Sequence, residues 1–168
     1  MNGTKPAARI FVGIGSNVGD RAGTVRAAVD CLKRIPETTV VRLSSLYETD
    51  PAGGVPQGKY LNAVCEVHSR TLPAPFLKVL QAIEMSLGRN RAAEIRWGPR
   101  TLDLDILFWG DLVHAEPGLE IPHPRLHERA FVLVPLAQIA PDLVHPRLNR
   151  SMRDLVEEAG SAGVSLHA

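Results

Sequence analysis

Two aspartates near the middle of the chain are the residues best suited to bind a metal ion. Asp103 and Asp105 alternate with aliphatic residues within positions 101–107. If this segment is a strand, successive side chains point to opposite faces, so both carboxylates share one face with their Cα atoms about 7 Å apart. Such a pair suits one or two divalent cations, and oxygen ligands favour Mg²⁺. An isolated Asp-x-Asp is more often a solvated pair of surface acids, so the neighbouring residues must decide.

The segment just before the aspartates is rich in arginine. Positions 89–100 contain four arginines and one glutamate, a local charge of +3 in a chain whose net charge is +1. Guanidinium groups beside a magnesium-binding acid pair suit a polyphosphate, because they bind the oxygens that the metal leaves free. The alternative is a solvated basic loop that pairs with the aspartates. The residues alone leave both interpretations open.

Aromatic and amide side chains indicate a second kind of ligand. Tyr60 and Asn62 share one face of an expected strand, and Phe131 follows in the C-terminal part of the chain. An amide can donate to and accept from the edge of a flat heterocycle, while aromatic rings stack on its faces. Taken alone, Tyr60 and Phe131 are more often core residues.

Hydrophobic spacing predicts the elements that position these residues. The order β-α-β-β-α-β is that of a ferredoxin-like α+β sandwich with an antiparallel sheet, to which a C-terminal extension is added. We expect helices on one face of the sheet and a ligand site or partial cover on the other. The expected elements are strands over 9–14, 38–49, 60–70 and 101–109, helices over 25–35 and from Pro73 to Gly88, and short helices near 128–139 and 152–160.

Length and composition favour one domain. The chain has 168 residues, of which 45% are hydrophobic and 22% charged. We expect a single domain over 9–168 after a flexible polar tail over 1–8. A net charge of +1 argues against binding nucleic acid or membranes by bulk attraction. We expect a cytoplasmic monomer with no membrane segment, in which Cys31 and Cys65 are reduced core residues.

Two other motifs carry less weight. The glycines at positions 13, 15 and 19 approximate the Gly-x-Gly-x-x-Gly fingerprint of dinucleotide-binding proteins, but the third glycine stands one position later than the fingerprint requires. A tight turn is the better explanation for these glycines. The pair His123 and His127 has helical spacing, but prolines flank His123 and no third ligand has zinc-like spacing. A phosphate or ribose contact is the more plausible role for His123. The sequence contains no Walker-type P-loop.

Residues 96–106 resemble the signature of a known enzyme family. Their sequence, Arg-Trp-Gly-Pro-Arg-Thr-Leu-Asp-Leu-Asp-Ile, is similar to that of the 6-hydroxymethyl-7,8-dihydropterin pyrophosphokinase family of folate biosynthesis. The resemblance implies a ferredoxin-like enzyme that transfers pyrophosphate from ATP to the hydroxymethyl group of the pterin and releases AMP. Other similar segments follow in family order between about residues 9 and 158; they are 13–17, 44–49, 60–63, Glu84 with 88–89, 121–125 and 129–131.

The resemblance also implies roles for single residues. Asp103 and Asp105 would hold two Mg²⁺ ions and, with Arg89 and Arg100, form the catalytic set. Deprotonation of the pterin hydroxyl would be assisted by the metal or by Asp103. Loops 16–20, 49–59 and 89–98 would close over the ligands. The residues implied to bind ATP are Glu84, Arg91, Arg96, Ile106, His123 and Arg129, and those implied to bind the pterin are Gly15, Thr49, Pro51, Ala52, Tyr60, Asn62, Trp97 and Phe131.

The chain departs from the family pattern in three places. Asp50 stands where a second proline is common, and Ala52 stands where a larger aliphatic residue packs near the pterin. The arginine-rich segment is one residue longer around 92–95, which leaves the register of Arg91 open.

Two rival functions start from the same residues. A ferredoxin-like sheet with exposed aromatic residues can bind RNA, but the chain lacks the basic-aromatic motif of such modules. A magnesium-dependent phosphodiesterase could use the same two aspartates, and it would hydrolyse ATP without a pterin.

Overall fold

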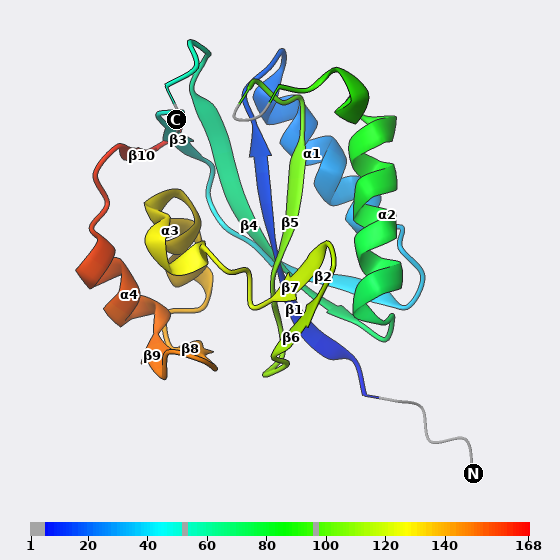
Figure 1. Cartoon of the computed structure of the whole chain (residues 1–168), viewed down its shortest axis with the longest axis vertical. Helices are drawn as coiled ribbons and strands as arrows, with labels where there is room; N and C mark the ends of the chain where they lie inside the picture. The colour runs from blue at the N-terminus through cyan, green and yellow to red at the C-terminus, as the bar shows by residue number, and fades with distance from the viewer. Residues whose placement is uncertain (1–5, 52–53, 96–97) are drawn as a thin grey trace.

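An antiparallel sheet forms the centre of the computed structural model, which describes residues 6–51, 54–95 and 98–168 (Figure 1). Five strands follow the order β10-β3-β4-β1-β5, and β2 also pairs with β4. The pairs of these strands are all antiparallel. The strands are β1 (Ala8–Ser16), β2 (Thr38–Leu43), β3 (Tyr47–Thr49), β4 (Tyr60–Ser69), β5 (Asp103–Trp109) and β10 (Val164–Leu166).

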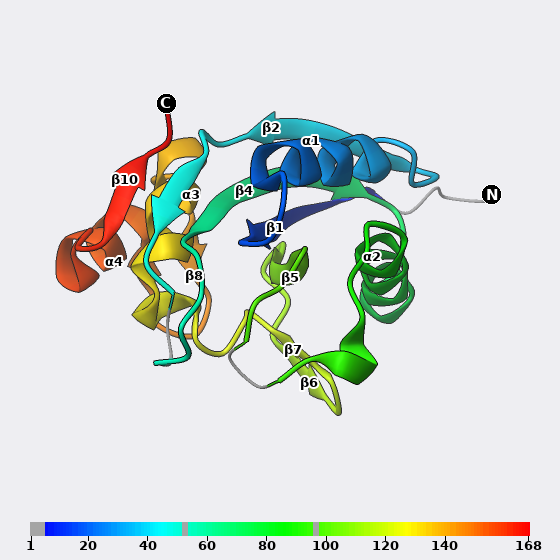
Figure 2. The same cartoon turned by 90° about the horizontal axis from the view of Figure 1, so that it is seen from above.

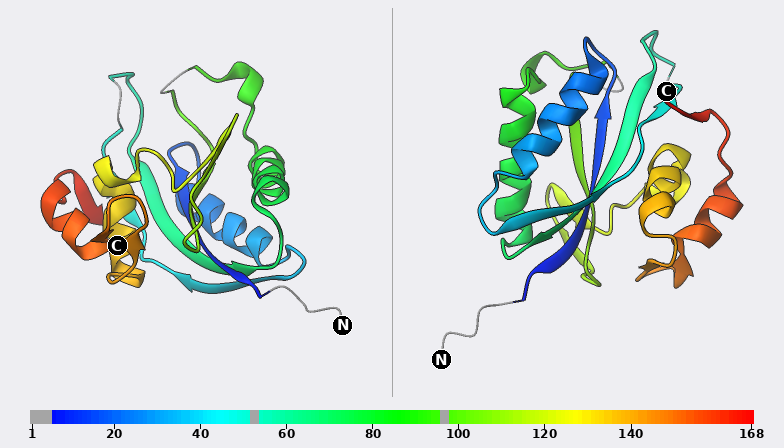
Figure 3. Two further views of the ribbon diagram at one scale, coloured as in Figure 1. Left: turned by 60° about the horizontal axis from the view of Figure 1, so that its bottom comes forward. Right: turned by 180° about the vertical axis from the view of Figure 1, so that it is seen from behind.

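Helices pack on both sides of this sheet. In Figures 2 and 3, α1 and α2 lie on one side, while α3 lies on the other side with α4 beside it. The helices are α1 (Arg21–Leu32), α2 (Pro73–Ser86), α3 (Ala130–Ile139) and α4 (Met152–Ala159). The remaining elements are the short turns η1 (Arg91–Ala93) and η2 (Leu126–Glu128), the hairpin of β6 (His114–Glu116) and β7 (Leu119–Ile121), and the pair β8 (Val144–His145) and β9 (Arg150–Ser151).

Local chemistry fixes the start of several helices. The Asp20 carboxylate accepts a hydrogen bond from the backbone N–H of Gly23 at the start of α1. Pro73 is the first residue of α2, where its missing N–H leaves no helical hydrogen bond unmade. At α4, Ser151 and Asp154 form a capping box.

The alternation of side chains along β1 creates two separate cores. Ile10, Val12 and Ile14 are buried with residues of α1 and α2. Phe11 points the other way and is buried with residues of α3, including Leu133. The second core covers only part of that face, and the rest of the face is open to a cavity.

The structure confirms the predicted strands and long helices and adds detail that periodicity does not give. The expected strand over 38–49 is interrupted between β2 and β3. The Ser44 hydroxyl accepts the backbone N–H of Val64 on β4, which replaces a backbone partner at this point. In β5, Leu107 and Phe108 both face the second core, because a register shift between Phe11 and Val12 of β1 breaks the alternation.

Two further expectations concern the cysteines and membrane segments. Cys31 and Cys65 are both free thiols. Cys65 is a core residue, and burial raises its pKa to about 12, whereas Cys31 is only partly buried and packs at the edge of the core. Within the described ranges, no helix combines the length and apolar character needed to cross a bilayer.

Candidate active site

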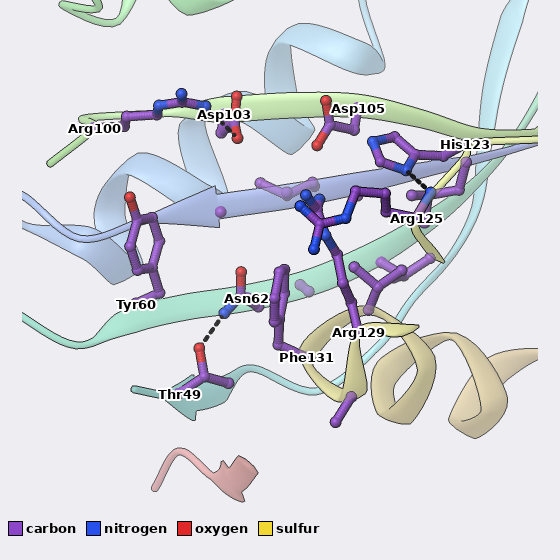
Figure 4. Close-up of a pocket in the computed structure, with 18 of the residues that line it drawn as sticks. Thr49, Tyr60, Asn62, Arg100, Asp103, Asp105, His123, Arg125, Arg129 and Phe131 are labelled. Carbon is purple, nitrogen blue, oxygen red and sulfur yellow. Dashed lines mark hydrogen bonds and ion pairs between the residues drawn. The ribbon is translucent and has the colours of Figure 1, made fainter. Parts of the chain in front are cut away.

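The two aspartates of β5 lie on the sheet face that α1 and α2 leave uncovered. Leu104 and Ile106 alternate with them and are buried in the core below those helices. Asp103 and Asp105 instead line a cavity of about 690 Å³ (Figure 4). The predicted separation of the carboxylates from the aliphatic residues is therefore confirmed.

Two glycines of β1 form the floor of this cavity. Gly15 pairs with Asp103 on β5 and with Asn62 on β4, and Gly13 pairs with Asp105. A Cβ atom at Gly15 would lie 3.1 Å from Oδ1 of Asn62, tighter than ordinary van der Waals contact. Glycine at this position therefore leaves the space between the acid pair and the amide empty.

An amide and two aromatic side chains line the cavity across β1 from the aspartates (Figure 4). The Asn62 amide nitrogen donates a hydrogen bond of 2.7 Å to the Thr49 hydroxyl, which fixes the orientation of the amide. The Tyr60 hydroxyl donates to the backbone oxygen of Gly98 at 3.3 Å, and burial is the main cause of its raised pKa. Phe131, on α3, lines the same cavity as Asn62.

Arg89 forms ion pairs with three acids, one of which is Asp103. Its Nη1 donates to Glu84 at 2.6 Å and to Asp103 at 2.7 Å. Its Nε and Nη2 donate to the two oxygens of Glu94 at 2.6 and 3.0 Å. Arg100 donates to the second oxygen of Asp103 at 3.0 Å. Both oxygens of Asp103 are thus occupied by arginines.

Asp105 has no such partner. Among residues 6–51, 54–95 and 98–168, no side chain or backbone group donates a hydrogen bond to its carboxylate. Burial, followed by the charge of Asp103, raises the pKa of Asp105 to about 7, and the charge of Arg129 partly offsets this. The Arg129 guanidinium lies 5.6 Å from the Phe131 ring centre and extends into the cavity.

His123 is a neutral donor at the edge of the cavity. Its Nδ1 accepts a hydrogen bond of 3.2 Å from the backbone N–H of Arg125. Burial, with the charge of Arg129, lowers the pKa of His123 to about 4, so the ring is uncharged at pH 7. A neutral ring that accepts at Nδ1 carries its proton on Nε2.

The structure brings most residues of the implied site together. Glu84, Arg89 and Arg91 lie outside the cavity lining, but Glu84 and Arg89 connect to it through Asp103 and the backbone of Leu104. The implied residues that line the cavity are Gly15, Thr49, Tyr60, Asn62, Arg100, Asp103, Asp105, His123, Arg129 and Phe131.

Five implied residues need separate mention. The side chain of Ile106 belongs to the core beneath α1 and α2, so it does not line the cavity as an adenine contact would. Pro51 is described by the structure but is not part of the lining either. Arg96 and Trp97, and likewise Ala52, lie outside the described residues.

Two residues of the site were not assigned a role from the sequence. The buried Asn17 accepts from the backbone N–H of Arg100 at 2.7 Å and donates to Gln57 and Gly58, so it joins two of the loops. Glu94 binds Arg89 through both oxygens. A lone acid within an arginine-rich segment was the available sequence indication for Glu94.

The donor set for a metal consists of two carboxylates. No group of three or more His, Cys, Asp or Glu side chains with metal-binding geometry occurs in the part of the chain that the structure describes. Mg²⁺ commonly binds one or two carboxylates and takes its other ligands from water and substrate phosphates. The unpartnered carboxylate of Asp105 beside Asp103 fits such an ion.

Known proteins resemble this chain over most of its length. Residues 11–141 match the family described as 7,8-dihydro-6-hydroxymethylpterin-pyrophosphokinase (HPPK). A 2-amino-4-hydroxy-6-hydroxymethyldihydropteridine pyrophosphokinase of Pseudomonas aeruginosa is 45% identical over 138 residues, which cover 82% of this chain and 84% of the relative. The protein of the same name from Bacillus subtilis is 46% identical over 129 residues, covering 77% and 76%.

Longer proteins contain a similar part. The folic acid synthesis protein fol1 of Schizosaccharomyces pombe is 37% identical over 158 residues, which cover 94% of this chain and 21% of the relative. The crystal structure of Plasmodium falciparum HPPK-DHPS with pteroate has a TM-score of 0.71 at 17% identity, and the match covers 93% of this chain and 43% of that one. The structural likeness shows a shared fold. From the match to its sequence over residues 11–141, the chain belongs to the 7,8-dihydro-6-hydroxymethylpterin-pyrophosphokinase family.

Proposed function

We propose that this chain transfers a pyrophosphoryl group from ATP to the hydroxymethyl oxygen of 6-hydroxymethyl-7,8-dihydropterin in folate biosynthesis. The products are AMP and the pterin diphosphate. The family and the names of the bacterial relatives support this reaction. One structural observation carries it: a single cavity is lined by the two carboxylates of β5 at its charged end and, across β1, by the Asn62 amide at its amide end, with arginines and aromatic rings around them.

The amide end is proposed to bind the pterin. Tyr60 and Phe131 offer ring faces for stacking, and Gly15 leaves room for the bicycle above the sheet. Because Thr49 accepts a hydrogen bond from the Asn62 nitrogen, the Asn62 oxygen remains to accept from an N–H group on the pterin edge. Pro51, Ala52 and Trp97 complete the proposed set.

The charged end is proposed to bind the triphosphate. Arg100 and Arg129 face the cavity as cations, and His123 contributes an uncharged N–H donor. Arg89 does not line the cavity but contacts Asp103, which does, and it completes the cations of this end. Glu84 and Arg91 belong to the proposed ATP set as well, and Glu84 holds Arg89 and Arg91 by ion pairs. Arg96 and the main chain around Ile106 complete the proposed ATP set.

Asp103 and Asp105 are proposed to hold two Mg²⁺ ions. Bound there, magnesium would neutralise charge on the polyphosphate and so favour attack on the β-phosphorus. The arginine contacts of Asp103 must rearrange in part when the metal arrives, because they occupy both of its carboxylate oxygens. Asp105 needs no such exchange.

The protein is proposed to promote the reaction by orienting the two substrates and by placing charged groups around the triphosphate. The pterin oxygen must approach the β-phosphorus in line with the departing AMP oxygen, so both substrates must be held at a fixed distance. The rigid sheet supplies that distance, because Asn62, Gly15 and Asp103 lie side by side on three paired strands. Asp103 is one candidate to accept the hydroxyl proton.

The finer points of architecture belong to the same proposal. The strand order β5-β1-β4-β2 with helices after β1 and β4 supports a ferredoxin-like sandwich. A single domain over 9–168, a monomeric state and a cytoplasmic location complete the proposal.

The test is to identify the nucleotide product. Incubation with Mg²⁺, ATP and the hydroxymethyl dihydropterin should release AMP and form the pterin diphosphate. ADP in place of AMP would contradict the proposal. A control without pterin should consume no ATP, whereas a phosphodiesterase would hydrolyse ATP in that control.

A further inference from the structure

Carboxylates accept from four of the five N–H groups of Arg89. Its side chain is only 4% exposed. Glu84 and Asp103 share its Nη1, and Glu94 takes the fork formed by Nε and Nη2. Burial alone would lower the pKa of Arg89, but the hydrogen bonds and charges of these acids outweigh burial and raise it. The guanidinium is therefore charged, and Glu94 occupies its edge formed by Nε and Nη2.

The three acids differ in how firmly they are held. Glu84 is 1% exposed and also accepts the backbone N–H of Leu104 at 2.8 Å, so the core fixes it. Asp103 is a proposed metal ligand and is fixed to β5. Glu94 is 18% exposed, follows the short turn η1 and is held in the described structure by Arg89 and Arg100. Glu94 is thus the acid that can leave most easily.

The position of Glu94 matches that of a phosphate group. Its two oxygens face Nε and Nη2 at 2.6 and 3.0 Å, the side-on fork that arginine also offers to phosphate. Hydrogen bonds from Arg89 lower the pKa of Glu94, so the carboxylate is ionised at neutral pH. An incoming polyphosphate can reach this edge of Arg89 only after Glu94 has moved.

The charges around Arg89 also balance. Three carboxylates face three guanidinium groups, so this ion cluster has no net charge. A polyphosphate gains full attraction from the arginines only when a carboxylate withdraws. The ion cluster consists of Glu84, Glu94, Asp103, Arg89, Arg91 and Arg100.

We propose that Glu94 occupies the phosphate-binding edge of Arg89 in the free protein and is displaced by a nucleoside triphosphate, so that Glu94 sets the affinity of the site for polyphosphates. This inference rests on the proposed function for the identity of the nucleotide. AMP lacks the β- and γ-phosphates, so it does not need the Arg89 edge and does not displace Glu94. Glu94 therefore acts through Arg89. It weakens the binding of polyphosphates and leaves the binding of the nucleoside part unchanged.

The test compares Glu94→Gln with Glu158→Gln, which removes one negative charge on α4 away from the cavity. The magnesium complex of α,β-methylene ATP, inorganic triphosphate and AMP are titrated calorimetrically into each protein. Glu94→Gln should lower the Kd of the first two by about tenfold and leave the Kd of AMP within about twofold. Its KM for ATP should fall without loss of kcat. Glu158→Gln should match the wild type.

A second variant guards against a folding defect. Glu94→Asp keeps the charge, but its shorter side chain cannot span the same fork, so it should bind triphosphate with intermediate Kd. Thermal unfolding of each variant checks that the fold is intact. Unchanged or weaker polyphosphate binding by both folded variants would overturn the inference, as would a failure of every protein to bind triphosphate. If binding follows the expected order but no AMP is formed, the proposed reaction is wrong and the role of Glu94 stands.

Discussion

Glu66 and Asp105 are acids on the same face of the sheet with opposite surroundings. Glu66 is 3% exposed, yet Arg9 donates to it at 2.7 Å, and Arg42 and His68 lie within 4.0 Å. Although burial raises its pKa, the hydrogen bonds from Arg9 and His68 and the charges of Arg9 and Arg42 lower it by more. No residue that the structure describes donates a hydrogen bond to Asp105, and its pKa is raised. A partly buried carboxylate without such a donor marks the place where a ligand can supply a positive charge, whereas Glu66 belongs to the scaffold.

The largest expected effect comes from removing the unmatched charge. Asp105→Asn should reduce the rate of AMP formation by about 100-fold or more, because a proposed metal ligand is lost. In the absence of metal, the same variant should unfold at higher temperature than the wild type at pH 8, because it lacks a desolvated carboxylate. Activity assays and calorimetric melting measure the two effects. Full activity would contradict the assignment of Asp105.

Removing the matched charge should have the converse result. Glu66→Gln should lower the free energy of unfolding by about 2 kcal/mol, since buried hydrogen bonds to charged groups are weakened. The pKa of Glu66 is lower in the folded than in the unfolded state. Glu66 therefore stabilises the fold at pH values above the ordinary carboxyl pKa, and this stabilisation is lost as the pH falls through the folded-state pKa.

Urea unfolding at pH 7 measures this change, with Glu158→Gln as the exposed control. Glu66 is not part of the proposed site, so kcat and KM should stay within about twofold of the wild type. A large loss of activity in the folded Glu66→Gln variant would show that Glu66, like Asp105, is needed for the reaction.

The pH dependence of metal binding sharpens the same contrast. The pKa of Asp105 is raised to about 7, so below that pH a proton competes with Mg²⁺. The affinity for Mg²⁺ should rise as the pH increases from 6 to 8, by up to about tenfold per unit below the pKa. In stability the sign is opposite: the folded state holds this proton more tightly than the unfolded one, so the metal-free protein loses stability as the pH rises from about 4 to 7.

Calorimetric titration with Mg²⁺ and the nucleotide analogue at several pH values measures the first effect. Proton release on binding should be greatest near and below pH 7. Asp105→Asn should remove the dependence, and an unchanged pH profile in that variant would place the titrating group elsewhere.

The sequence predicted the position of Asp105 better than the ion pair of Glu66. The alternation of Asp103 and Asp105 with Leu104 and Ile106 predicted which side chains share a face, because strand geometry has a period of two. The match of Glu66 to Arg9 could not be predicted in this way. It depends on the register of β1 against β4, which places residues 57 positions apart beside each other.

The same limit explains what was missed in the site. The arginine-rich segment and the acids were recognised, and a loop pairing with the aspartates was one of two alternatives. The structure shows Arg89 and Arg100 paired with Asp103. Which acid meets which arginine follows from packing against the buried Glu84, and residue type alone carries no information about that packing.

The smallest expected effect concerns the floor between the two ends of the cavity. In Gly15→Ala, the new Cβ would lie 3.1 Å from Oδ1 of Asn62, whereas in Gly13→Ala it would lie 3.4 Å from the flexible end of Leu107. The first variant should raise KM for the pterin by about three- to tenfold, because the amide must shift, and the second should change it less. Steady-state assays with each substrate varied separately would check this. An equal rise of KM for ATP in Gly15→Ala would mean that the floor does not separate an amide end from a charged end, since the disturbance at Asn62 would then reach both ligands alike.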